Sequence, residues 1–198
     1  MNWALIVIPI SILAILLLAV GYYFNRLVVL GNRYQNAFSQ IDVQLKRRYD
    51  LIPNLVECVK GYLSHEKGTL EAVASARNQA MAASRAAATK PGDAVAMEQL
   101  SQAEGALSGA VGRLIAVAES YPELKASQNM LGLQEELTTT ENRVGFARQA
   151  FNDSVTAYNS QRQTFPCVLV ASLCGFRDAS LLQAATERER AAPEIKLE

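Results

Sequence analysis

The chain has 198 residues, and its 19 Lys and Arg residues balance 19 Asp and Glu residues, so the formal net charge is zero. Half of the residues are apolar and thirty are alanine, which excludes disordered, collagen-like and disulfide-framework chains. One histidine, His65, leaves little material for histidine-based catalysis or metal binding, and a neutral chain has no general attraction to nucleic acid. The length suggests one domain. We expect a helical protein without a catalytic, cofactor or metal site.

The N-terminal segment predicts a membrane span. Trp3 to Phe24 is a run of 22 residues without charge. As a helix it is about 33 Å long, enough for a hydrocarbon core of about 30 Å. Aromatic residues mark both of its ends, as they do at membrane interfaces. A cleaved signal peptide is the alternative, although no basic residue precedes the run. Residues 1–24 are therefore assigned as a transmembrane anchor.

The charges that flank the span predict its orientation. Arg26 and Arg33 follow the span, whereas no Lys or Arg precedes it. The positive-inside rule then places the N-terminus outside and the bulk of the chain in the cytoplasm. The odd number of cysteines, Cys58, Cys167 and Cys174, agrees with a reducing compartment. A periplasmic bulk domain is the alternative orientation.

Beyond the span, apolar residues recur with helical spacing and form coiled-coil-like seams. The predicted helices cover about residues 25–62, 65–89, 94–120 and 123–163. Gly61 and Gly68 favour a turn between the first two, and one uninterrupted helix is the alternative. Lys90-Pro91-Gly92-Asp93 separates the second from the third, and Pro122 ends the third. Pro53 lies inside the first helix and predicts a kink there.

These elements predict an all-α fold, in which the transmembrane helix precedes an up-and-down four-helix bundle. Short connections favour antiparallel neighbours, so two long helices pair together and two shorter helices pair together. We assign residues 25–164 to the bundle, residues 165–176 to an apolar juxtamembrane or capping segment, and residues 177–198 to a mobile tail.

Charge is divided unevenly along the chain. Residues 25–90 carry ten basic and five acidic residues, net +5, and residues 91–198 carry nine basic and fourteen acidic residues, net −5. Opposite charges attract within one chain or between chains. Self-association is therefore one use that the sequence suggests for this division.

Charged residues also interrupt the apolar stripes. Arg48, Arg77 and Glu104 each occupy the stripe of a different helix, and Glu141 lies beside the stripe of the fourth. When the chain is folded at its predicted turns, all four fall within about one helical turn of one level. Buried charges are stable only when they are paired. This predicts either a polar layer that fixes helix register or a ligand or switch site; shallow stripes whose charged ends reach solvent are the other alternative.

Several ordered motifs resemble the LemA family of bacterial membrane proteins. They are Arg47-Arg48-Tyr49-Asp50-Leu51-Ile52-Pro53-Asn54-Leu55-Val56, Tyr121-Pro122-Glu123-Leu124-Lys125-Ala126, Leu133-Gln134-Glu135-Glu136-Leu137, Thr140-Glu141-Asn142-Arg143, Ala147-Arg148 and Pro193-Glu194-Ile195. The resemblance implies one N-terminal span, a helical bundle and no settled activity. It also implies an association with membrane quality control, including HtpX-type metallopeptidases. The family's recurrent polar residues include Arg48, Arg77, Glu141 and Arg148, and Asp50 belongs to its opening motif. With Glu104, these residues are assigned to one structural or interaction layer.

The segment after the fourth helix is apolar but too short to span a bilayer. Its candidate membrane contacts are Phe165, Val168, Leu169 and Phe176. If the fourth helix descends toward the membrane, this segment either lies at the interface or caps the two long helices.

Three functions follow from these observations. The sequence lacks a His-Glu-x-x-His motif, a Gly-rich phosphate loop and paired-cysteine metal spacing, so we expect no enzymatic activity. We expect a single-pass protein of the bacterial inner membrane that acts as a scaffold or adaptor. It would form homo-oligomers, contact the lipid bilayer and engage other membrane proteins, for example in quality control. A sensor that binds a ligand at the Arg/Glu layer is the alternative, and a hydrolase of unfamiliar type is the third.

Overall fold

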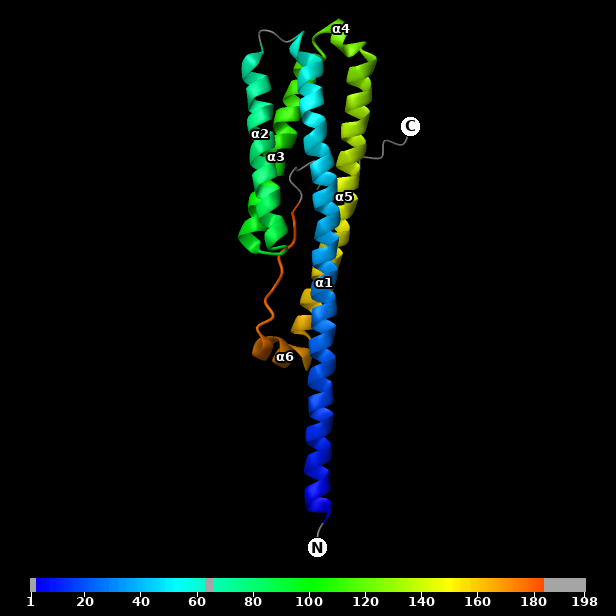
Figure 1. Cartoon of the computed structure of the whole chain (residues 1–198), viewed down its shortest axis with the longest axis vertical. Coiled ribbons are helices and arrows are strands. Elements are labelled where there is room, and N and C mark those ends of the chain that lie inside the picture. The colour runs from blue at the N-terminus through cyan, green and yellow to red at the C-terminus, as the bar shows by residue number, and fades with distance from the viewer. Residues whose placement is uncertain (1–2, 63–65, 184–198) are drawn as a thin grey trace, which may run out of the picture.

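The computed structural model describes residues 3–62 and 66–183, and all regular structure within these ranges is helical (Figure 1). The elements are α1 (Ala4–Lys60), α2 (Lys67–Thr89), α3 (Ala94–Ala118), α4 (Pro122–Lys125), α5 (Gln128–Gln163) and α6 (Cys167–Cys174). The all-α class predicted from the sequence is confirmed for this part of the chain.

Helix α1 is one continuous rod of 57 residues (Figure 1). At a rise of about 1.5 Å per residue its length is about 86 Å. Its N-terminal part is long and apolar enough to cross a membrane, and the most apolar window is 0% buried. The helix does not end at Pro53, whose ring lies on the exposed face, and it continues to Lys60. One helix thus carries both the apolar run and part of the helical body.

The predicted turn between the first two helices of the body is present. Helix α1 ends at Lys60 and α2 begins at Lys67, so the two are not one uninterrupted helix. Residues 63–65, between the two helices, lie outside the described residues. The break before α3 occurs at Gly92, where φ is +84°, a conformation that glycine adopts without strain.

The fourth predicted helix is divided into α4 and α5, which corrects the expectation of one helix over residues 123–163. Pro122 opens α4, as expected of a proline in a first helical turn. The short helix ends in a turn in which the Ser127 amide donates to the Leu124 carbonyl. Ser127 is extended and precedes the first residue of α5. Periodicity alone did not separate the two segments because both keep their apolar side chains inward.

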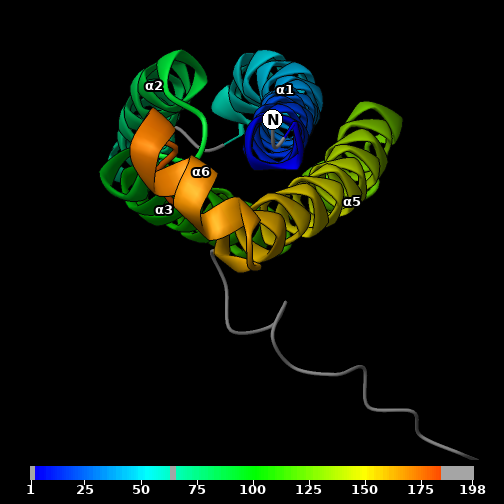
Figure 2. The same cartoon turned by 90° about the horizontal axis from the view of Figure 1, so that it is seen from below.

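The helices pack chiefly as two pairs, α1 with α5 and α2 with α3, and α1 also contacts α2. Figure 2 shows α1 between α2 and α5 when the molecule is seen from the N-terminal end of α1. Aromatic rings fill the α1–α5 pair: the ring centroids of Phe38 and Phe151 are 5.6 Å apart, and those of Tyr34 and Tyr158 are 5.2 Å apart. Edge-to-face contacts of this kind add to the free energy of apolar burial.

Helix α6 lies across the lower end of the helical body and contacts α1 and α5 (Figures 1 and 2). Cys167, Val170 and Ala171 form its buried side. The Phe176 ring, just after α6, contacts the Phe24 ring of α1 at 5.5 Å between centroids. Because Phe24 ends the uncharged run of α1, α6 lies level with the end of the predicted span.

Residues 177–183, which we call the C-terminal strap, run upward from α6 along the helical body (Figure 1). Ala179 and Leu182 are buried, each 5% exposed. The Ser180 amide donates to the Gly92 carbonyl at 2.8 Å. The expectation of a mobile tail beginning at residue 177 is therefore wrong for these seven residues, because their backbone and two of their side chains are held by the body. Residues 184–198 lie outside the described residues.

Candidate functional site

The most strongly polar part of the core lies where α1 faces α3. An Arg48 Nη1 to Glu104 Oε2 ion pair spans 3.0 Å, and the two side chains are only 8% and 10% exposed. The other terminal nitrogen of Arg48 donates to Ser108 Oγ at 2.7 Å. Arginine can satisfy two acceptors at once because its planar head carries several donors in fixed directions. The pair is thereby neutral and hydrogen-bonded, the condition under which buried charge is tolerated.

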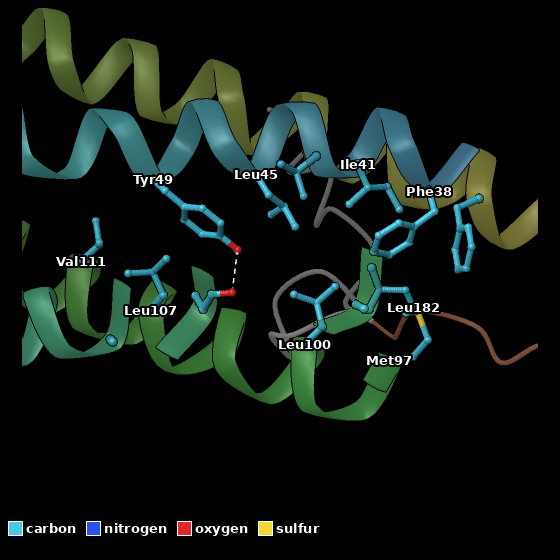
Figure 3. Close-up of a cluster of buried hydrophobic side chains, with 14 of the residues drawn as sticks. Phe38, Ile41, Leu45, Tyr49, Met97, Leu100, Leu107, Val111 and Leu182 are labelled. Carbon is cyan, nitrogen blue, oxygen red and sulfur yellow. Dashed lines mark hydrogen bonds between the residues drawn. The ribbon is translucent and has the colours of Figure 1, made fainter. Parts of the chain in front are cut away.

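Tyr49 extends this cluster to α2. Its hydroxyl lies 2.5 Å from Glu104 Oε1 and 3.2 Å from the backbone carbonyl of Ala80. Figure 3 shows the Tyr49 ring reaching from α1 across the core, between Leu45 and Leu107. Arg77 of α2 adds a second contact between α2 and α1, because its Nε donates to the Tyr49 backbone carbonyl at 2.7 Å. Five polar side chains from three helices, Arg48, Tyr49, Arg77, Glu104 and Ser108, thus form one network.

Burial determines the electrostatics of this network. Burial raises the pKa of the Glu104 carboxyl above its ordinary value, and the Arg48 charge and the Tyr49 hydrogen bond oppose this effect. The negative charge of Glu141 raises the pKa further. Burial, followed by the Glu104 charge, also raises the pKa of the Tyr49 hydroxyl. Tyr49 therefore remains a protonated donor to Glu104 at physiological pH.

The structure brings together part of the set predicted from the sequence. Arg48 and Glu104 meet directly, and Arg77 is half-buried and joins them through the backbone of Tyr49. Glu141 is exposed at the rim, and Arg148 is half-buried there. Rather than two arginines and two glutamates buried together, the structure buries one of each.

The structure also places Asp50 outside the network, because its side chain is exposed. The exposed position of Glu141 follows from the rotation of α5 about its axis. Leu137 and Val144 occupy the buried stripe of α5 on either side of it, so Glu141 lies at the edge of that stripe. The height of a charged residue along the bundle therefore does not predict its burial when it lies beside an apolar stripe. Rotation about the helix axis decides whether its side chain enters the core.

Tyr49 and Ser108 are the members of the network that sequence reasoning missed. Tyr49 stands four residues after Leu45, and it therefore shares a helical face with a core residue. That spacing was a usable signal, but the apolar ring concealed the role of its hydroxyl. Ser108 gave no signal, because a serine on a helix is common and its partner lies 60 residues away in sequence.

A small cavity adjoins the network between α1, α3, α5 and the strap. Its volume is about 30 Å³, room for roughly one water molecule. Its lining residues are Ile41, Leu45, Arg48, Leu100, Ser101, Glu104, Ser108, Glu141, Val144, Arg148, Leu182 and Gln183. Within residues 3–62 and 66–183 there is no group of three or more His, Cys, Asp and Glu residues that could hold a metal ion. The cluster is thus a hydrogen-bonded polar contact beside a small cavity.

The candidate membrane contacts lie around α6. Phe165 is 77% exposed, and Val168 and Leu169 are also exposed. Phe176 is instead half-buried against Phe24. Leu173, which the sequence prediction did not include, is 86% exposed. Four of these five apolar side chains therefore remain uncovered by the body, at the level where the uncharged run of α1 ends.

The family assignment rests on a match over most of the chain. The family model described as "LemA family" matches residues 37–197. The chain belongs to the LemA family. The matched region contains the whole polar network, the strap and α2 to α6, so the resemblance predicted from the sequence motifs is confirmed.

Several relatives support the same assignment. The chain is 24% identical over 169 residues to "Magnetosome protein MamQ" of Magnetospirillum gryphiswaldense, covering 78% of this chain and 62% of the relative. It is 23% identical over 175 residues to "Magnetosome protein MamQ 2" of Paramagnetospirillum magneticum, covering 81% and 64%. "Protein LemA" of Metamycoplasma hominis is 27% identical over 161 residues, covering 81% and 69%. The chain thus spans less than two thirds of the length of the two magnetosome proteins.

Proposed function

We propose that this protein is a membrane-anchored helical scaffold that self-associates and engages other membrane proteins, in the envelope or in membrane-protein quality control. The observation that carries the proposal is the continuity of α1, whose 57 residues include both the apolar run and one wall of the helical body. A continuous helix fixes the height and direction of the body relative to the membrane. A fixed projecting body suits a protein that presents a surface to neighbours.

The interior of the body supports the same proposal. We treat α1, α2, α3 and α5 as an up-and-down four-helix bundle whose polar network sets register and partner choice. Arg48, Glu104 and Tyr49 satisfy one another, and the adjoining cavity holds about 30 Å³. A buried polar group that is matched inside the core specifies which helices meet, the best-attested role of such groups. The network then maintains a shape and takes no part in a reaction.

Helix α6 gives the proposed scaffold a second contact with the bilayer, at the membrane interface, which we call its seat. Leu169 and Leu173 are spaced by four residues on α6, so they lie on one side of this helix, and they are 57% and 86% exposed. Phe165, in the turn that precedes α6, is 77% exposed. An apolar helical face of this kind lies in the interfacial plane of a membrane. We place the N-terminus outside and the body on the cytoplasmic side of a bacterial inner membrane.

Mild-detergent purification of the full chain from its native membrane tests the scaffold. The expected result is a particle heavier than one chain in its micelle, together with other membrane proteins, among which an HtpX-type metallopeptidase is a candidate. A matched purification in a denaturing detergent identifies contaminants that bind without the folded body. A lone monomer with no enriched partner would contradict the proposal.

Photo-crosslinking tests the seat of α6 in intact membranes. A photoreactive amino acid replaces Phe165 in one variant and Phe146 of α5 in the control, since these phenylalanines are 77% and 74% exposed. Lipid adducts are expected at position 165 and not at position 146. Equal yields of lipid adducts at the two positions would contradict membrane contact by α6 and would leave the proposed N-terminal anchor unaffected.

A ligand-responsive regulator is the second candidate, and one observation favours it. The pKa of Glu104 is raised by burial beside a small cavity, so binding near it can change its charge. The Arg48→Met and Glu104→Met double variant removes the charged pair while preserving side-chain volume. A folded double variant that keeps its partners would favour the scaffold, and one that folds but loses a conformational response would favour the regulator.

A further inference from the structure

The C-terminal strap is held in the manner of a bound peptide. Asn159 Nδ2 donates to the Ala179 carbonyl at 2.8 Å, and the Ala179 amide donates to Asn159 Oδ1 at 3.1 Å. Asn152 makes the same pair with Leu182, at 3.0 Å and 2.9 Å. A side-chain amide has both a donor and an acceptor, so each asparagine satisfies both backbone groups of one strap residue. We call Asn152 and Asn159 the asparagine clamps.

The spacing of the clamps selects an extended backbone. The two asparagines are seven residues apart on α5, which is about 10.5 Å along a helix. The strap residues that they hold are three apart, which is about 10 Å in an extended chain. A helical segment of three residues would cover only about 4.5 Å and would miss one clamp. The match in length is therefore itself a recognition feature.

Side chains add specificity to the clamps. Ala179 faces Gly92, where an added Cβ would lie 3.0 Å from the Ala179 Cβ, so neither position has room for a larger residue. Leu182 points into the core between α1 and α3, near Phe38 and Met97 (Figure 3). The groove thus fits a small residue followed, three positions later, by a leucine.

The charged end of the strap is also fixed. Arg162 of α5 is paired with Asp178, and the Tyr158 hydroxyl donates to the Arg177 carbonyl at 2.9 Å. These contacts, like those of the clamps, come entirely from α5. Recognition therefore requires only the groove and a peptide of matching sequence.

We propose that this groove accepts the strap of a second copy of the chain, so that neighbouring copies in one membrane exchange straps. A second copy carries the same sequence. Exchange therefore reproduces the hydrogen bonds of the asparagine clamps, the packing of Ala179 and Leu182 and the Arg162–Asp178 ion pair, as in domain swapping. The shared membrane anchor holds copies parallel, with straps and grooves at one height, which raises their effective concentration. Gly175, with φ of +74°, lies just before the strap at the end of α6, and backbone rotation there redirects it.

This inference rests on the self-association in the proposed function and supplies its contact. The two can fail separately, because copies can associate through another surface while every strap remains in its own groove.

A peptide test measures recognition by the groove. Ala179→Phe in the full chain displaces the strap, because the ring has no room against Gly92. A fluorescent peptide with the sequence of residues 175–183 is expected to bind this variant saturably, in mild detergent, and at least ten-fold more tightly than it binds the wild type. A peptide with Leu182→Asp, and an acceptor that also carries Asn152→Ala and Asn159→Ala, should each reduce binding ten-fold or more.

Circular dichroism tests whether the Ala179→Phe variant keeps its helical content, which the peptide test requires. If Ala179→Phe alters the helical content, Leu182→Asp in the full chain displaces the strap instead, through an unpaired charge in the core. A folded, strap-displaced variant that does not bind the peptide would overturn the proposal.

A complementation test measures exchange in the membrane. The donor copy carries Asn152→Ala and Asn159→Ala, so it cannot hold a strap, and has a photoreactive residue in place of Leu181, which is 46% exposed. The acceptor copy carries Ala179→Phe and intact clamps. Crosslinking between the two tagged copies should exceed that of a wild-type pair several-fold, and should vanish when the acceptor loses its clamps.

The outcomes separate the two proposals. Copies that co-purify without a strap crosslink would overturn exchange and leave the scaffold intact. Copies that do not co-purify would overturn exchange together with self-association.

Discussion

The two helix pairs of the body, α1 with α5 and α2 with α3, differ in the kinds of side chain that they bury. Between α1 and α5, aromatic rings meet edge to face, Phe38 against Phe151 and Tyr34 against Tyr158. In the second pair, α2 buries small residues, among them Ala76, Ala80, Ser84 and Ala87, and α3 buries large residues such as Leu100, Leu107 and Leu114. Rings fill a wide interface, whereas small residues allow close approach of the backbones.

The contrast extends to what joins the pairs. Apolar packing dominates within each pair, but the Arg48–Glu104 ion pair and the Tyr49 hydroxyl cross from one pair to the other. Apolar contact is tolerant of small rotations, and hydrogen bonds are directional. The apolar seams therefore supply most of the free energy of folding, and the polar network determines which surfaces of the pairs face each other.

Arg48→Met gives the largest expected effect, because it removes the counterion of Glu104 inside the core. We expect a loss of about 3–5 kcal/mol in the free energy of unfolding. Adding Glu104→Met should recover most of this loss, since a matched apolar pair is close to neutral. Chemical unfolding of the full chain in mild detergent, followed by circular dichroism, measures both variants. A double variant as unstable as the single one would mean that the network itself stabilises the fold.

Phe151→Ala tests the aromatic pair. Phe151 is 0% exposed, and its truncation leaves a cavity between α1 and α5 that costs about 3–4 kcal/mol. Phe146→Ala on the same helix is the matched control, because Phe146 is 74% exposed, and it should change the stability by less than about 0.5 kcal/mol. Similar losses for both variants would contradict the assigned core of the α1–α5 pair.

Ala80→Leu tests close approach in the second pair. Ala80 is fully buried and its carbonyl lies beside the Tyr49 hydroxyl, so added methyl groups separate α2 from its neighbours. Overpacking of this kind costs about 1–3 kcal/mol. Ala86→Leu, at an exposed position of the same helix, is the control and should be close to neutral in the same unfolding assay.

The smallest expected effect is a dependence of stability on pH. Burial raises the pKa of Glu104 above the ordinary 4.5, so between these two values the folded state binds more protons than the unfolded state. The contribution of Glu104 to stability is therefore greatest at low pH and declines as pH rises through its raised pKa. Unfolding of the wild type and of Glu104→Gln across this range should show the decline only in the wild type. Parallel curves would argue against a raised pKa.

Local patterns in the sequence determined the elements of this protein. The uncharged run at Trp3–Phe24, the break at Pro91-Gly92 and the helical spacing of the apolar residues were sufficient to predict an anchor and a helical body. They also predicted that Arg48, Arg77 and Glu104 belong to seams. These features are local because helical periodicity relates residues three and four apart, and uncharged length is read directly from the chain.

Tertiary structure decided which of these residues meet. The rotation of α5 about its axis left Glu141 at the rim, and the reach of Tyr49 into α2 made it part of the network. The strap was unpredictable for the same reason: Asn152 and Asn159 capture backbone 30 and 20 residues away, and a backbone group carries no sequence signal. The sequence by itself determined the helices and the anchor, and only the packed structure determined the network and the groove, because directional contacts depend on the relative rotation of whole helices.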